Sequence, residues 1–166
     1  LTNGELVAEE NGSELATHAL RNRATVAGNL VTASPCGDMA SPLLCLDASV
    51  EITGPSGART IPLSEFIEGV KKTVLRSEEL VTRVLVPPKY RDAHGGYHKL
   101  KRIKGHDLGL VSVALLRSNG TMRVAVSSAA PTPVLLPDFA GDSSVEAVQK
   151  AAQEAISPID DVRCTK

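Results

Sequence analysis

Alternating apolar and polar residues predict that much of this chain forms short β-strands. An apolar side chain at every second position gives a strand one face for the core and one face for water. The pair Asn119-Gly120 separates the last two runs, and this pair favours the tight turn of a β-hairpin. The runs with the strand pattern are residues 49–54, 58–63, 80–86, 97–103, 108–117 and 121–127.

A helical spacing of apolar residues is clearest near the end of the chain, at residues 145–156. Val148 and Ala152 recur at an interval of four, which places them on one face of a helix, and Ser143 or Ser144 can cap that helix. Strands and helices that follow one another without a strict βαβ alternation indicate an α+β fold. Shorter helices are predicted at residues 14–19, 43–48 and 65–69.

Residues 89–96 divide the chain into two parts, because this segment is polar and contains two glycines. Such a composition is typical of a linker. We therefore predict a first lobe at residues 1–88 and a second lobe at residues 97–166, the second built on an antiparallel sheet with helices.

Composition narrows the class of protein. The net charge of −1 gives no basic surface for nucleic acid, and the aromatic content of 2% leaves no platform for stacked bases. No run approaches the roughly 20 apolar residues that a membrane-spanning helix needs. Cys36, Cys45 and Cys164 lack metal-ligand spacing, so we predict no metal site, reduced thiols and a cytoplasmic setting, with Cys36 as a small, half-buried filler.

Residues 21–42, RNRATVAGNLVTASPCGDMASP, form the most distinctive segment. The tripeptide Ala27-Gly28-Asn29 stands between two apolar tracts and predicts a tight turn, since Gly28 lacks a Cβ and Asn29 tolerates a left-handed backbone. Consecutive N–H groups around such a turn could hold phosphate oxygens, and Asp38 could accept hydrogen bonds from a sugar. A plain hairpin turn is the alternative interpretation.

The same segment resembles the second flavin-binding motif in the FAD subunits of molybdenum hydroxylases, the xanthine dehydrogenase and carbon monoxide dehydrogenase group. The family pattern is R-N-x-A-T-[IV]-G-G-N followed by S-P-x-x-D. This chain has RNRATVAGN from Arg21 to Asn29 and SPCGD from Ser34 to Asp38. Ala27 replaces the first glycine of the pattern, which would cost roughly 1–2 kcal/mol if that position needed a positive φ. A methyl group would be tolerated if only close approach were needed.

Two later segments carry the same resemblance. The family has a K-T-x-L-x-x-x-E motif whose apolar residue packs on the isoalloxazine ring, and here that residue would be Val74 or Leu75. An ordinary core position is the alternative for both. The pattern Y-x-K-x-x-R-x-x-x-x-D is matched from Tyr97 to Asp107, and it implies that Lys99 approaches the flavin ring or the phosphates. A solvated basic strand face is the alternative.

The resemblance implies an α+β fold with a PCMH-type FAD-binding lobe, followed by a lobe like the C-terminal domain of the CO dehydrogenase flavoprotein. It implies that FAD is the cofactor and that electrons pass from iron–sulfur clusters through FAD to an external acceptor. A molybdopterin-binding large subunit and a 2Fe-2S small subunit are the implied partners. The residues implied to bind FAD are Thr25, Val26, Ala27, Gly28, Asn29, Ser34, Asp38, Leu75 and Lys99.

The family also has an earlier lobe with the first glycine-rich phosphate motif, and a final helix, that this sequence lacks. We therefore expect the chain to be a fragment that is inactive alone, contains no FAD in isolation and covers its exposed apolar face by self-association. A non-catalytic interaction module that no longer binds FAD is the alternative function.

Overall fold

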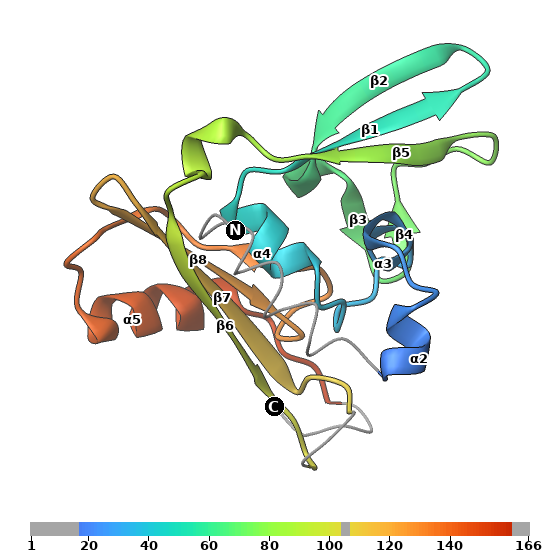
Figure 1. Cartoon of the computed structure of the whole chain (residues 1–166). Helices are drawn as coiled ribbons and strands as arrows, with labels where there is room; N and C mark the ends of the chain where they lie inside the picture. Colours follow the sequence, from blue (N-terminus) through green and yellow to red (C-terminus); the bar gives the residue numbers. More distant parts are fainter. Residues whose placement is uncertain (1–16, 104–106, 161–166) are drawn as a thin grey trace.

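Two antiparallel sheets form the framework of the protein in a computed structural model, which describes residues 17–103 and 107–160 (Figure 1). The smaller sheet has the order β2-β1-β5, from β1 (Ser49–Gly54), β2 (Gly57–Pro62) and β5 (Leu80–Leu85). The larger has the order β10-β8-β7-β6, with β9 paired to β8. Its strands are β6 (His94–Leu100), β7 (Val111–Ser118), β8 (Thr121–Ser127), β9 (Val134–Leu135) and β10 (Phe139–Ala140). A further pair consists of β3 (Ile67–Gly69) and β4 (Lys72–Thr73).

Short helices connect and cover these sheets. Helix α4 lies between the smaller and the larger sheet in Figure 1, and each of its six residues is buried. It contacts β7 and β8, and its side chains share one hydrophobic core with residues of β1, η2 and β7. The helices are α2 (His18–Arg21), α3 (Val26–Val31), α4 (Ala40–Cys45), η1 (Leu63–Glu65), η2 (Pro88–Tyr90) and α5 (Val145–Ala155).

The predicted hairpin at Asn119-Gly120 is confirmed. Strands β7 and β8 pair from Ser112↔Ser127 to Ser118↔Thr121, so the turn contains only these two residues. Asn119 has φ +50° and Gly120 has φ +74°, as a type I′ turn requires at both central positions. The backbone twist of a type I′ turn matches the twist of the two strands that it joins.

Helix α5 is also confirmed, to within one residue of the predicted end. The Ser144 hydroxyl accepts a hydrogen bond from the Ala147 N–H and caps the helix. Val148 and Ala152 pack against a second, smaller core that contains Met122, Val124 and Leu136. The helix therefore covers the β8 side of the larger sheet.

Several expected elements are corrected. Residues 65–69 form the end of η1 and then β3 rather than one helix, because Phe66 is fully buried and the Val74 N–H donates to its carbonyl. The helix expected at residues 43–48 lies at Ala40–Cys45, with Pro42 in its first turn. Of the helix expected at 14–19, residues 14–16 lie outside the described part of the chain.

Residues 89–96 contain η2 residues and the start of β6. Tyr90 and Ala93 from this segment are buried in the core that α4 organises, and Gly95 and Gly96 pair with Leu116 and Leu115 of β7. The two glycines thus extend a strand at this place. The division of the chain into two domains at this segment stays a prediction.

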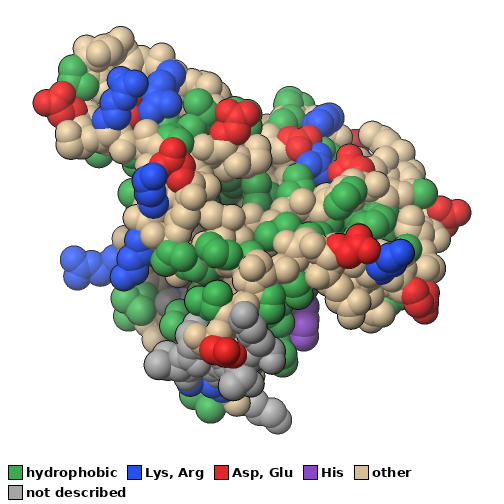
Figure 2. All heavy atoms as spheres, turned by 180° about the vertical axis from the view of Figure 1, so that it is seen from behind, with side chains coloured by type: hydrophobic (Ala, Val, Ile, Leu, Met, Phe, Trp, Pro, Cys, Tyr) green, Lys and Arg blue, Asp and Glu red, His purple; other side chains and the backbone are tan. Residues whose placement is uncertain are grey.

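Acidic and basic side chains are interspersed on the face shown in Figure 2, in keeping with the net charge of −1.

An ionic cluster of several side chains is centred on Asp47, which follows α4. Its carboxylate lies 2.6 Å from Arg123 Nη2, 2.6 Å from Lys89 Nζ and 2.6 Å from the Tyr90 hydroxyl. Burial disfavours the ionised carboxylate, but the hydrogen bonds from Arg123, Lys89 and Tyr90 outweigh it and hold the pKa of Asp47 well below its usual range.

Replacing Arg123 by Leu leaves Asp47 without its main counter-charge. We expect Arg123→Leu to lower the free energy of unfolding in urea by about 2 kcal/mol, less than for a fully buried pair because Asp47 is 34% exposed. The control is Arg117→Leu, an exposed position on β7, with a change within about 0.5 kcal/mol. Equal stabilities of the two variants would contradict a role for this cluster.

Glu79 gives the fold a defined acid sensitivity. Hydrogen bonds from Arg59 and from the Arg76 N–H lower the pKa of Glu79 from 4.5 to about 2. Because the folded-state pKa is depressed, this contribution to stability is present above pH 4.5 and is lost as the pH falls toward 2. We expect Glu79→Gln to flatten the decline of unfolding free energy in that window, measured by urea titration at each pH. A slope equal to that of the wild type would count against this.

Candidate functional site

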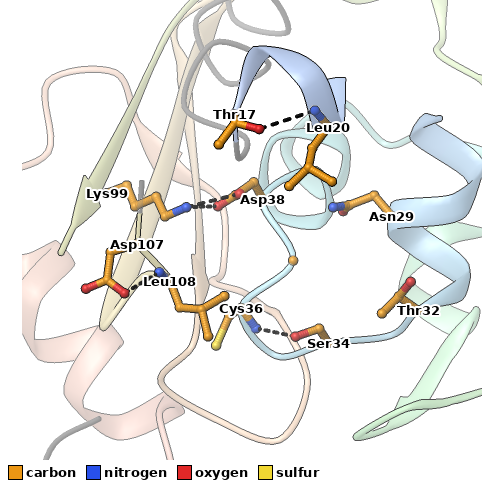
Figure 3. Close-up of a pocket in the computed structure, with 11 residues that line it drawn as sticks. Thr17, Leu20, Asn29, Thr32, Ser34, Cys36, Asp38, Lys99, Asp107 and Leu108 are labelled. Carbon is orange, nitrogen blue, oxygen red and sulfur yellow. Dashed lines mark hydrogen bonds and ion pairs between the residues drawn. The ribbon is translucent and has the colours of Figure 1, made fainter. Parts of the chain in front are cut away.

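A cavity of about 440 Å³ lies where α2, α3 and the loop after α3 face the larger sheet (Figure 3). This volume is within the usual range for small-molecule sites. Hydroxyl, amide, amine and carboxylate groups share its wall with two exposed leucines. The lining residues are Thr17, Leu20, Asn29, Thr32, Ser34, Cys36, Gly37, Asp38, Lys99, Asp107 and Leu108.

The loop of residues 34–38 forms one wall of the cavity, and we call it the SPCGD loop. It is closed by a hydrogen bond from the Gly37 N–H to the Ser34 carbonyl at 2.9 Å, while the Ser34 hydroxyl accepts from the Cys36 N–H at 3.3 Å. A Cβ on Gly37 would lie 3.1 Å from the Ser34 carbonyl oxygen and 3.3 Å from Asn29 Oδ1. A side chain at this position would press against its neighbours, so the close packing of the loop favours glycine here.

A buried ion pair fixes the end of this loop to the larger sheet. Lys99 Nζ lies 2.9 Å from Asp38 Oδ1 and 3.1 Å from Oδ2, and the Tyr97 hydroxyl donates to Asp38 Oδ1 at 3.0 Å. The side chains of Lys99 and Asp38 are 3% and 7% exposed. Tyr97 and Lys99 reach the same carboxylate because alternate residues of β6 point to one face of the sheet.

The turn predicted at Ala27-Gly28-Asn29 is wrong. These residues lie inside helix α3, whose N-cap is Thr25, with its hydroxyl accepting from the Gly28 N–H at 2.9 Å. Neither Ala27 nor Gly28 has a positive φ, so alanine brings no backbone strain at position 27. The apolar tract looked β-prone, but the Thr25 cap starts a helix there.

Asn29 joins α3 to the SPCGD loop. Its side-chain oxygen accepts from the Met39 N–H at 3.2 Å, and its amide nitrogen points toward the cavity in Figure 3. Leu20 of α2 borders the same space. The helical conformation, not a left-handed turn, is what aims Asn29 at the loop.

The cavity offers several hydrogen-bond donors to a ligand. Lys99 uses its ammonium for two close contacts with Asp38, which leaves a third N–H, and the hydroxyls of Thr17 and Ser34 accept from backbone N–H groups and keep their own protons. With Leu20 and Leu108, each more than half exposed, the wall fits a ligand that is rich in acceptor atoms and has an apolar face.

Four of the predicted residues, Asn29, Ser34, Asp38 and Lys99, line this one cavity although up to 70 positions separate them in the sequence. Lys99 is therefore not on a solvated basic face. Asp38 receives protein donors, Lys99 and Tyr97, where the sequence indicated a sugar. The predicted residues that do not line the cavity are Thr25, Val26, Ala27, Gly28 and Leu75.

Leu75 and Val74 are half-buried and pack against the main core, so their predicted contact with a flavin ring stays a prediction. Arg102 and Asp107 from the same motif pair at 3.5 Å, and the Arg102 hydrogen bond lowers the pKa of Asp107. Cys36 is half-buried, as predicted, but it lines the cavity.

Sequence reasoning missed Thr17, Leu20, Thr32, Gly37 and Leu108 as lining residues. Thr17 caps helix α2 and Leu20 lies in it. The sequence of this segment, with its two Asn-Gly pairs, did not indicate that the helix borders a site. The glycine of the SPCGD motif was a usable signal, because glycine between Pro and Asp often marks close backbone packing.

A cavity with a buried Lys–Asp pair, several donors and an apolar rim, on an α+β fold of two antiparallel sheets, defines a cofactor-binding domain. Comparison with known families makes this specific. The chain belongs to the family of the FAD binding domain in molybdopterin dehydrogenase, whose model matches residues 5–89. FAD is the cofactor of this family.

Known relatives and structures agree with this family and with the α+β fold. The carbon monoxide dehydrogenase medium chain of Hydrogenophaga pseudoflava is 30% identical over 163 residues, covering 90% of this chain and 56% of that protein. The xanthine dehydrogenase FAD-binding subunit of Escherichia coli O157:H7 is 32% identical over 128 residues, covering 74% and 44%. The reconstituted CO dehydrogenase from Oligotropha carboxidovorans superimposes with a TM-score of 0.83 at 27% identity, covering 96% and 60%. The chain thus spans about half the length of the curated relatives it matches.

The part of the chain that the structure describes contains no group of three or more His, Cys, Asp or Glu residues suited to hold a metal ion. Within the same residues, none of the helices has the length and apolar character needed to cross a membrane.

The buried Lys99–Asp38 pair gives a direct test of the site's construction. Lys99→Met removes the ammonium from the buried Asp38 carboxylate, and we expect the free energy of unfolding to fall by about 3 kcal/mol. Adding Asp38→Asn to that variant removes the uncompensated charge and restores at least half of the loss. Lys150→Met, exposed on α5, is the control with little change. Equal stability of Lys99→Met and the control would contradict the pairing.

Proposed function

We propose that this chain is the part of an FAD-binding subunit that holds the flavin beside the SPCGD loop. In this role the flavin receives electrons from iron–sulfur clusters and passes them to an external acceptor. The observation that carries the proposal is the convergence of Asn29, Ser34, Asp38 and Lys99 on one cavity in a chain of an FAD-binding family.

Polar and apolar residues of the cavity would bind different parts of the cofactor. The hydroxyls of Thr17 and Ser34, the Asn29 amide and the remaining Lys99 proton would donate to acceptor atoms of the cofactor. Leu20 and Leu108 would cover its apolar surface. When bound, FAD supplies the redox chemistry, and a nearby ammonium such as that of Lys99 would stabilise negative charge on the reduced ring.

The names of the similar structures support a proposal for the wider assembly. These structures are named as CO dehydrogenases and as a quinoline 2-oxidoreductase, and one of them is named as a Cu,Mo-CO dehydrogenase. We propose a molybdopterin-binding large subunit and a 2Fe-2S small subunit as partners of this chain, with self-association as a further contact. In the described part of the chain Cys36 and Cys45 form no disulfide, in keeping with the reducing, cytoplasmic setting that we propose.

Titration with FAD of a complete FAD-binding subunit that contains this chain tests the proposal. We expect flavin fluorescence to be quenched on binding, and Leu108→Asp to raise the dissociation constant at least about tenfold, because a carboxylate would be desolvated against the apolar ring. Leu108 is 57% exposed, so the fold should tolerate the change.

The matched control is Leu100→Asp, a leucine of β6 that is 51% exposed and outside the cavity lining. It should leave the dissociation constant unchanged. Equal effects of the two variants would place the flavin elsewhere. A complete wild-type subunit that binds no FAD would overturn the proposal and favour a non-catalytic interaction module.

A further inference from the structure

We propose that Ser128 is a positioning residue for the SPCGD loop, and through it for the donors that face the cavity. The inference rests on the proposed function in one respect, namely that the cavity takes FAD. Ser128 follows β8 directly and lies in none of the motifs that resemble the flavoprotein family.

The contact is made by both polar groups of Ser128. Its N–H donates to the Pro35 carbonyl oxygen at 2.8 Å, and its hydroxyl lies 3.4 Å from the same oxygen. Pro35 has no N–H, so its carbonyl is its only backbone group able to hold the loop by a hydrogen bond. The neighbours of Pro35, Ser34 and Cys36, both line the cavity. A shift of Pro35 would therefore move both of them.

The Ser128 backbone has to adopt an unusual conformation to make this contact. Its φ is +69°, in the left-handed region that non-glycine residues rarely occupy. The preceding residues of β8, including Ser127 with no exposed surface, fix the direction from which the chain arrives. The left-handed step is what turns the Ser128 N–H toward Pro35. Residues with a branched Cβ strongly resist this step, whereas glycine adopts it freely.

The second anchor of the loop adjoins the first. A Cβ built on Gly109, which is buried, would lie 3.4 Å from Lys99 side-chain carbons and 3.7 Å from the Ser128 hydroxyl. Lys99 holds Asp38 at one end of the loop, and Ser128 holds Pro35 near the other end. The larger sheet therefore fixes the SPCGD loop at two points, and the sequence predicted neither contact.

Three substitutions separate this role from general stability. Ser128→Val opposes the left-handed backbone and is expected to withdraw the N–H from Pro35. Ser128→Gly keeps the backbone and the N–H, so it should rescue the positioning. Asn119→Val imposes the same conflict at φ +50° in the β7–β8 hairpin, at the far end of β8 and about 25 Å away at ~3.4 Å per residue.

The first measurement needs no cofactor. Amide hydrogen exchange of Cys36 and Gly37, whose N–H groups bond within the loop, should be about tenfold faster in Ser128→Val and close to wild type in Ser128→Gly. Asn119→Val should accelerate exchange in the hairpin and leave the loop unchanged. Unchanged loop exchange in a folded Ser128→Val protein would overturn the inference. If that variant does not fold, faster loop exchange in Ser128→Ala than in Ser128→Gly decides in its favour, and equal rates decide against it.

The second measurement is FAD affinity, followed by flavin fluorescence and by the visible absorption bands. The expected result is a five- to tenfold weaker affinity in Ser128→Val, the loss of one hydrogen bond's contribution, with rescue in Ser128→Gly and no change in Asn119→Val. Suppose that Ser128→Val accelerates loop exchange but the complete wild-type subunit binds no FAD. This result would refute the proposed function, while the contact between Ser128 and Pro35 would still position the loop. Wild-type FAD binding that Ser128→Val does not weaken would overturn the positioning role alone.

Discussion

The buried pair of Lys99 and Asp38 is the interaction on which the rest of the site depends. A carboxylate and an ammonium that are each more than nine-tenths buried persist only if they meet each other, and this requirement brings the loop after α3 to strand β6. Tyr97 shares the carboxylate from the same face of β6. Once Asp38 is held there, Asn29, Ser34 and Cys36 face a common space, and the cavity follows from the position of one side chain.

Helix α4 explains why that pair can be buried at all. The chain leaves Asp38 directly into a helix with six buried residues, which packs on β7 and β8 and joins them to the core of the smaller sheet. Two residues after the helix lies Asp47, whose carboxylate binds Arg123 of β8 together with Lys89 and Tyr90 of η2. An ion pair therefore stands near each end of this buried segment, and both connect it to the larger sheet. The SPCGD loop is held in place because the buried helix α4 that follows it is held in place.

This arrangement gives a physical meaning to the motif shared with flavoproteins. Its residues have three different roles here: Thr25 caps a helix, Asn29 accepts a hydrogen bond from the Met39 N–H just after the loop, and Asp38 pairs with Lys99 of the larger sheet. Alanine in place of glycine at position 27 is tolerated because the backbone there is helical. The residues of this motif therefore stabilise the packing of the helix and the loop, whatever they also offer to a ligand.

Local patterns in the sequence determined the elements that neighbouring residues control. The alternation of β7 and β8, the Asn119-Gly120 turn and the Ser144 cap of α5 each depend on residues a few positions apart, and the family motifs identified the cofactor. The helix at residues 26–31 also has a local cause, the Thr25 cap, although the tract alone suggested a turn between strands. Tertiary structure decided the rest. Asp38 and Lys99 are 61 positions apart, and Pro35 and Ser128 are 93 apart. No short-range pattern reports such contacts, because they form only when the buried helix α4 brings the loop onto the larger sheet.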